Sequence, residues 1–138
     1  MYDVLCFFCG STNVSASVQN SRDPLIRSTS KPTVLWDWTD GTYYFSGAAD
    51  YQVLFTNYLF SDITTVTITA TNTSSKYDLS VVLKSKEPWY TPDISVSSRV
   101  INVGDAQTWT VYNLDPSKEY YILFGAPCKF TGSISKIQ

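Results

Sequence analysis

The chain has 138 residues, enough for one domain with a sizeable core. It contains no histidine, which excludes imidazole as a base or metal ligand, and a net charge of −2 with ten dispersed Lys and Arg residues argues against nucleic-acid binding. Aromatic residues make up 15% of the chain, Ser and Thr are abundant and Glu is rare, which predicts an all-β fold. No apolar run is long enough to span a membrane.

Residues 1–33 are predicted to form an N-terminal strand and an extended arm. Met1–Gly10 is apolar but lacks the basic start of a secretory signal, so the chain is either made without a recognisable signal peptide or has already lost one. Gly10–Thr33 is polar and poor in large apolar residues, with one short strand expected at Val14–Val18. We expect this arm to dock on a protein partner or on a second copy of the chain.

The three cysteines are expected to be structural thiols. Cys6 and Cys9 have the spacing of a zinc knuckle, but a structural zinc site needs four ligands and only Cys128 remains to add a third. An odd number of cysteines also argues against a closed disulfide framework. A disulfide, a metal site and a redox pair stay open as alternatives, and the prediction is that there is no metal and no cofactor.

Residues 34–138 are predicted to form a single β-sandwich, jelly-roll-like, of about eight strands. The clearest strand is Ile63–Thr71, where apolar residues alternate with threonines, so that one face meets a core and the other meets water. The apolar parity shifts by one within Ile94–Val103, which predicts a β-bulge near Ser98–Arg99. The other strands are expected at Thr42–Ser46, Tyr51–Phe60, Tyr77–Leu83, Gln107–Leu114, Lys118–Ala126 and Thr131–Ile137.

Trp36, Asp37 and Trp38 form the first candidate binding motif. In a strand, the two Trp side chains would share one face beside a carboxylate, and flat aromatic surfaces with a hydrogen-bonding acid are suited to sugars. The alternative is that the Trp side chains fill the core and that Asp40–Gly41 makes a hairpin turn. Nothing in the sequence supports Asp37 and Asp40 as a glycosidase pair.

Trp89 and Tyr90 form the second candidate. They lie in a loop between Pro88 and Pro92, and a loop has no core of its own for large aromatic side chains to fill. Prolines on both sides reduce the entropy that the loop would lose on binding. A contact role is therefore one interpretation, and a loop folded back over the end of the sandwich is the other.

A family resemblance rests on short segments of the C-terminal half, within residues 42–137. They are Tyr77-Asp78-Leu79, Val103-Gly104-Asp105, Asn113-Leu114-Asp115-Pro116 and Glu119-Tyr120-Tyr121-Ile122. Their order resembles bacterial pre-peptidase C-terminal domains and similar jelly-roll accessory modules. The resemblance implies a non-catalytic accessory domain. The acidic cluster usual in that family is reduced here to Asp78, so no calcium site is expected.

No catalytic residue is predicted, because the chain offers no nucleophile with a neighbouring base. The predicted function is a non-catalytic assembly or recognition module, a structural subunit of a particle or surface assembly such as a phage virion accessory protein. The alternative is a secreted carbohydrate-binding or accessory module of an extracellular enzyme. The expected location is a virion, a cell surface or the extracellular space, with protein or glycan partners.

Overall fold

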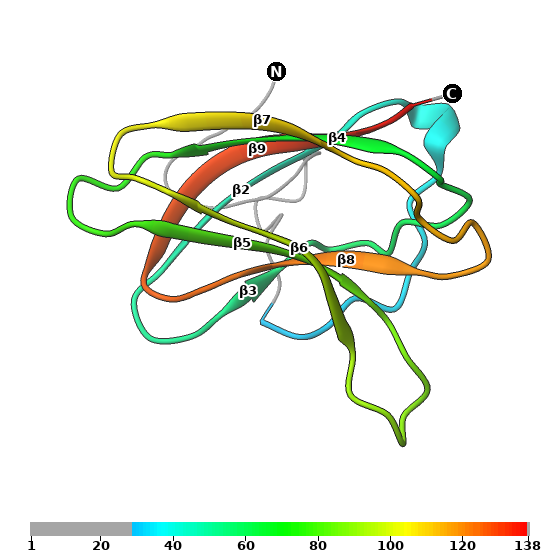
Figure 1. Cartoon of the computed structure of the whole chain (residues 1–138). Coiled ribbons are helices and arrows are strands. Elements are labelled where there is room, and N and C mark those ends of the chain that lie inside the picture. Colours follow the sequence, from blue (N-terminus) through cyan, green and yellow to red (C-terminus); the bar gives the residue numbers. More distant parts are fainter. Residues whose placement is uncertain (1–28, 138) are drawn as a thin grey trace.

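The computed structural model describes residues 29–137, and this part of the chain is an all-β sandwich (Figure 1). Eight antiparallel strands form two four-stranded sheets, which confirms the predicted fold class. A 3₁₀ turn, η1 (Trp38–Asp40), precedes them. The strands are β2 (Tyr43–Ala49), β3 (Leu54–Phe55), β4 (Val66–Asn72), β5 (Leu79–Ser85), β6 (Ile94–Ile101), β7 (Ala106–Val111), β8 (Tyr120–Phe124) and β9 (Cys128–Lys136).

The two sheets have the strand order of a jelly roll. One sheet runs β2-β9-β4-β7 and the other β3-β8-β5-β6, so the first strand pairs with the last, the second with the next to last, and so on inward. Three pairs, from outermost to innermost, are Tyr43 with Ile134, Val66 with Val111 and Ser85 with Ile94. In the sequence, the midpoint between the two residues of each pair lies within one residue of Trp89. The domain is therefore one long hairpin, folded over into two sheets, with Trp89 at its tip.

The core lies between the two sheets and follows the predicted alternation of residues. In β4, Val66, Ile68 and Ala70 are fully buried, whereas the threonines between them are partly exposed on the outer face. There, Thr67 and Thr69 make side-chain hydrogen bonds to the threonines opposite them on β7. Because each residue obeys a period of two, this strand was predictable from its own sequence.

The predicted strand Tyr51–Phe60 is largely wrong, because only Leu54–Phe55 pairs as β3. The Thr56 hydroxyl accepts a hydrogen bond from the backbone N–H of Ile122 on β8 and donates one to the carbonyl of Tyr58. This side chain replaces a main-chain partner and interrupts the ladder, and pairing with β8 resumes only at Phe60, which exchanges two backbone hydrogen bonds with Tyr120. Tyr51, at the start of the predicted strand, is 98% exposed.

The predicted bulge lies in β6, but at a different place. Leu83 pairs with Ser97 and Lys84 with Ser95, which leaves Val96 as the extra residue instead of Ser98–Arg99. The apolar residues used for that prediction do not all face the core, since only Ile101 of β6 is buried. β6 is an edge strand, and its contacts with Trp109 of the other sheet are made by Ser97 and Arg99, whereas Val96 and Val100 stay exposed.

Candidate functional site

Trp36, Asp37 and Trp38 do not lie on one face of a strand, so that part of the prediction was wrong. Trp38 begins η1, and Asp37 caps it by accepting hydrogen bonds from the backbone N–H and the hydroxyl of Thr39, at 2.9 and 2.7 Å. The same bonds lower the pKa of Asp37 below its ordinary value. Asp40–Gly41 ends this turn with a positive φ at Gly41 and does not form a hairpin.

Both indole rings of this segment are engaged within the domain. Trp36 donates its Nε1–H to the carbonyl of Gly41 at 3.0 Å, and its ring packs edge-on against Tyr43 and Tyr58. Trp38 donates to the carbonyl of Ser61 at 2.9 Å, and its ring lies 5.6 Å from Phe60. Both are half-buried against the core, so their faces are not arranged as an open aromatic platform.

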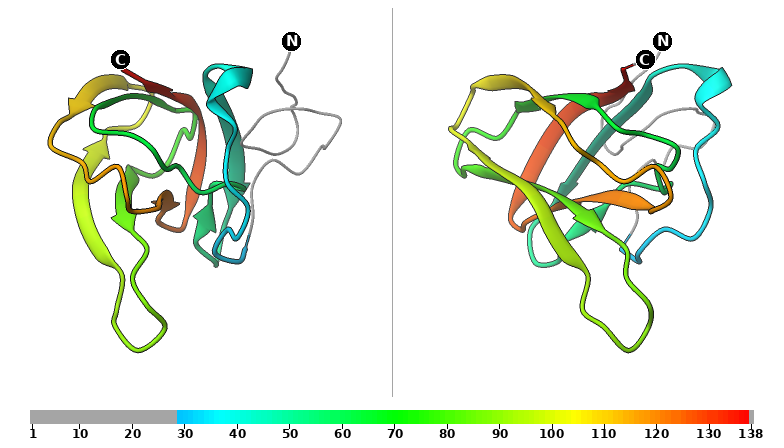
Figure 2. Two further views of the ribbon diagram at one scale, coloured as in Figure 1. Left: turned by 90° about the vertical axis from the view of Figure 1, so that its right-hand side faces the viewer. Right: turned by 45° about the vertical axis from the view of Figure 1, so that its right-hand side comes forward.

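Trp89 and Tyr90 have the opposite environment. They lie at the tip of the hairpin 86–93, here called the aromatic hairpin, which joins β5 to β6 and projects beyond both sheets (Figures 1 and 2). Trp89 is 96% exposed and Tyr90 is 71% exposed, and their rings meet edge to face, 5.7 Å apart. The interpretation in which this loop folds back over the sandwich is therefore wrong. The sequence placed two aromatic residues in a loop, and the structure presents them to solvent.

Asp93 holds the base of the aromatic hairpin. Its side chain is only 7% exposed, and Oδ1 accepts the backbone N–H of Glu87 across the hairpin at 2.9 Å. Oδ2 accepts the hydroxyl of the buried Tyr121 at 2.5 Å and pairs with the ammonium of Lys31 at 3.0 Å. Burial, the largest single influence, favours the neutral acid, but the three donors together outweigh it and lower the pKa of Asp93 to about 2.

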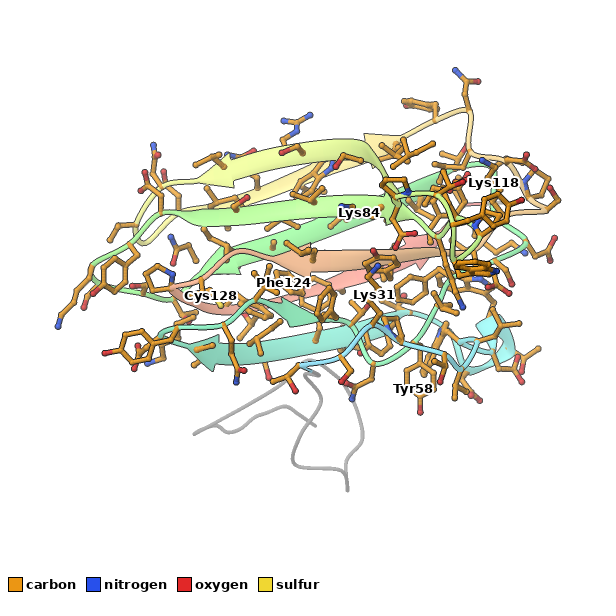
Figure 3. All side chains as sticks on the ribbon, turned by 90° about the horizontal axis from the view of Figure 1, so that it is seen from below. Lys31, Tyr58, Lys84, Lys118, Phe124 and Cys128 are labelled. Atoms are coloured by element: carbon orange, nitrogen blue, oxygen red, sulfur yellow. The ribbon has the colours of Figure 1, made fainter. Side chains whose placement is uncertain are left out.

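A second set of polar contacts braces the other arm of the hairpin. Glu87 accepts hydrogen bonds from the hydroxyl of Ser85 at 2.8 Å and the ammonium of Lys118 at 3.1 Å. The bond from Ser85, and then that from Lys118, lower the pKa of Glu87, and the same pairing raises the pKa of Lys118. Lys31 and Lys118, labelled in Figure 3, thus pair with the two acidic residues at the base of the hairpin, Asp93 and Glu87.

The tip itself is a tight turn between two prolines. The backbone N–H of Thr91 donates to the carbonyl of Pro88 at 2.8 Å, which closes a four-residue turn containing both aromatic residues. No residue from Pro88 to Pro92 carries a charge. An apolar tip on a hydrogen-bonded base can bind by contact at little cost in entropy, and it carries no acid, base or nucleophile pair.

Sequence reasoning singled out the tip of this site and missed its base. Lys31 and Tyr121 are 62 and 28 residues away from Asp93 in the chain, so their convergence depends on the folded topology. One local signal was present, because the acidic residues Glu87 and Asp93 flank the two prolines.

Within residues 29–137 no group of three or more potential metal ligands is close enough to hold an ion, and no helix is long and apolar enough to cross a membrane. Cys128 is buried in β9, and the predictions for Cys6, Cys9, the strand at Val14–Val18 and most of the arm concern residues outside the described range. No protein-family model matches the chain, and neither a curated protein nor a solved structure matches it significantly.

Proposed function

We propose that the chain is a non-catalytic assembly or recognition module, a structural subunit of a particle or surface assembly, and that the aromatic hairpin is its contact element. The observation that carries the proposal is the exposure of Trp89, at 96%, on a hairpin fixed by buried polar contacts. Trp and Tyr are the residues most enriched among those that dominate binding energy at protein interfaces. Holding two large aromatic side chains at the end of a projecting hairpin does not stabilise the domain itself, so their exposure supports a role in contact.

The environment of the carboxylates supports a non-catalytic role. Asp37 caps a turn, Asp115 accepts from the N–H and hydroxyl of Ser117, and Asp93 ties the hairpin together. Their pKa values are lowered, which suits acceptors in fixed turns and hairpins and does not suit a general acid, for which the pKa must rise.

A carbohydrate-binding or accessory module is the second candidate, because an exposed indole face can also stack on a sugar ring. The ring planes of Trp89 and Tyr90 are 87° apart, so together they form a wedge rather than a flat platform. A wedge fits a pocket on a protein better than a linear glycan. Binding to a polysaccharide that is lost in Trp89→Ala and kept in Trp36→Phe would favour the second candidate.

The proposal is tested by producing the tagged full-length chain in its native host and separating assemblies from free protein on a density gradient. We expect the chain to sediment with a large assembly, and the double variant Trp89→Ala/Tyr90→Ala to remain in the free fraction. The matched control is Tyr51→Ala, which removes an equally exposed aromatic side chain from the loop between β2 and β3. A wild-type chain found only in the free fraction, or a double variant that assembles normally, would contradict the proposal.

A further inference from the structure

Exposed apolar side chains gather along β6, the edge strand that follows the aromatic hairpin. Among the described residues, seven of the fourteen exposed large hydrophobic side chains lie on β6 or in loops at its two ends. They are Tyr77, Trp89, Tyr90, Ile94, Val96, Val100 and Val103. Tyr77 belongs to this group because Asn72 hydrogen-bonds to the carbonyls of both Tyr77 and Ile101, the last residue of β6. Together they mark β6 and its two ends as one exposed apolar surface.

The free edge of β6 lacks the charges that usually prevent pairing between sheets. Among the described strands β6 pairs only with β5, and its sequence contains no Lys, Asp, Glu or Pro. Its one charge, on Arg99, lies 5.4 Å above the ring of Trp109 on β7. The side chain of Gln107 donates to the carbonyl of Val100 at 3.1 Å, and this oxygen keeps a second lone pair.

We propose that β6 pairs antiparallel with β6 of a second copy of this chain, about a twofold axis at Ser98. The inference rests on the proposed function, since it names the partner of the same surface. An axis at Ser98 sets Val96 of each copy opposite Val100 of the other, and cross-strand pairs of β-branched residues stabilise a sheet. An axis at Arg99 would instead set two like charges directly opposite each other, which is unfavourable. The interface is isologous and closes at two copies.

The antiparallel direction also gives the aromatic hairpin a place to pack. It carries Trp89 and Tyr90 of one copy toward the opposite end of the other copy, where Tyr77 and Val103 are exposed. The three aromatic side chains, at 150–250 Å² each and 46–96% exposure, and the four half-exposed aliphatic ones together expose roughly 700 Å² in each copy. Two copies together then exceed the total of about 1,000 Å² that a specific interface needs. A second copy therefore supplies enough area, whereas a single short peptide along β6 would leave the hairpin exposed.

The test uses charges placed at the axis of the full-length chain. Ser98 is exposed, so Ser98→Lys and Ser98→Asp leave the core untouched but place like charges opposite each other in each homodimer. The matched control is Thr108→Lys, at an exposed position on β7, the edge strand of the other sheet. Sedimentation velocity across the micromolar range measures the monomer–dimer equilibrium.

We expect the wild type and Thr108→Lys to dimerise alike, and each Ser98 variant to bind itself roughly tenfold more weakly, equivalent to about 1.4 kcal/mol. An equimolar mixture of Ser98→Lys and Ser98→Asp should regain dimer formation, because opposite charges then meet at the axis. A monomeric wild type, or Ser98→Lys that dimerises normally, would overturn the inference. A monomeric wild type whose incorporation into the assembly still needs Trp89 would leave the proposed function standing. A dimer sensitive to Ser98 in a chain that never enters an assembly would refute that function alone.

Discussion

Replacing Asp93 by Asn tests whether one carboxylate fixes the base of the aromatic hairpin. The change keeps the size of the side chain but removes the charge that accepts from Glu87, Tyr121 and Lys31. The pKa of Asp93 falls from 3.8 to about 2, and a shift of nearly two units corresponds to about 2 kcal/mol of folding free energy at neutral pH. Loss of one charge-assisted hydrogen bond costs a similar amount of folding free energy.

Urea denaturation at pH 7, followed by Trp fluorescence, should therefore show Asp93→Asn to be about 2 kcal/mol less stable than the wild type. Hydrogen exchange should show faster exchange of the Glu87 amide, which donates to this carboxylate. Asp78→Asn is the matched control, since it removes the same charge from an exposed loop residue. Equal stability of Asp93→Asn and the wild type at pH 7 would refute the assignment of Asp93 as the residue that holds the base.

The pH dependence gives a second check on the same residue. Because the pKa of Asp93 is lower in the folded chain, its contribution is complete above the unfolded pKa of 3.8 and is lost as the pH falls toward about 2. The difference in unfolding free energy between the wild type and Asp93→Asn should accordingly shrink as the pH falls from 5 to 2. A difference that stays constant across this range would mean that packing, and not the charge, is responsible.

Four other substitutions have outcomes set by local geometry. Gly132→Ala should destabilise the fold by at least about 3 kcal/mol, seen as loss of folded protein by circular dichroism, because its Cβ would clash with the backbone carbonyl oxygen of Thr69. Gly125→Ala should cost clearly less, because its Cβ would lie 3.3 Å from the Cβ of Ser80, so a small shift relieves the contact. Asn72→Ala should cost about 2 kcal/mol in urea denaturation, since it leaves two backbone carbonyls without their donor. Trp89→Ala should change the unfolding free energy by less than about 0.5 kcal/mol, because its side chain touches little of the domain, and a larger loss would contradict its solvent-exposed placement.

The sequence predicted the fold class and the central strands because these depend on local alternation. β4 repeats a period of two without interruption, and each of its apolar residues faces the core. The apolar residues of β6, with one shift of parity, also predicted a core face, but only Ile101 of this edge strand is buried. Periodicity states which residues share a face, and it does not state whether another layer covers that face.

The candidate site was predictable in part for a similar reason. The prolines around Trp89 and Tyr90 marked a loop, and exposure of its aromatic residues was one of the two interpretations that the sequence left open. The Trp36 segment was misread because the spacing of two Trp residues suggested a strand, whereas Asp37 and Thr39 form a cap that starts a 3₁₀ turn. A capping residue followed by a hydroxyl was the signal for the observed turn, and it was overlooked.

The nested pairing has a consequence for how the domain folds. β9 lies between β2 and β4, although it is the last of the eight strands to be synthesised. Until it arrives, β2 has no neighbour in its sheet among the described strands, and β4 keeps one open edge. Contacts between distant parts of a chain form slowly, so the exposed edges persist during synthesis and favour association with other chains. The hairpin 86–93, whose two arms are close in sequence, is where pairing can begin without waiting for the rest.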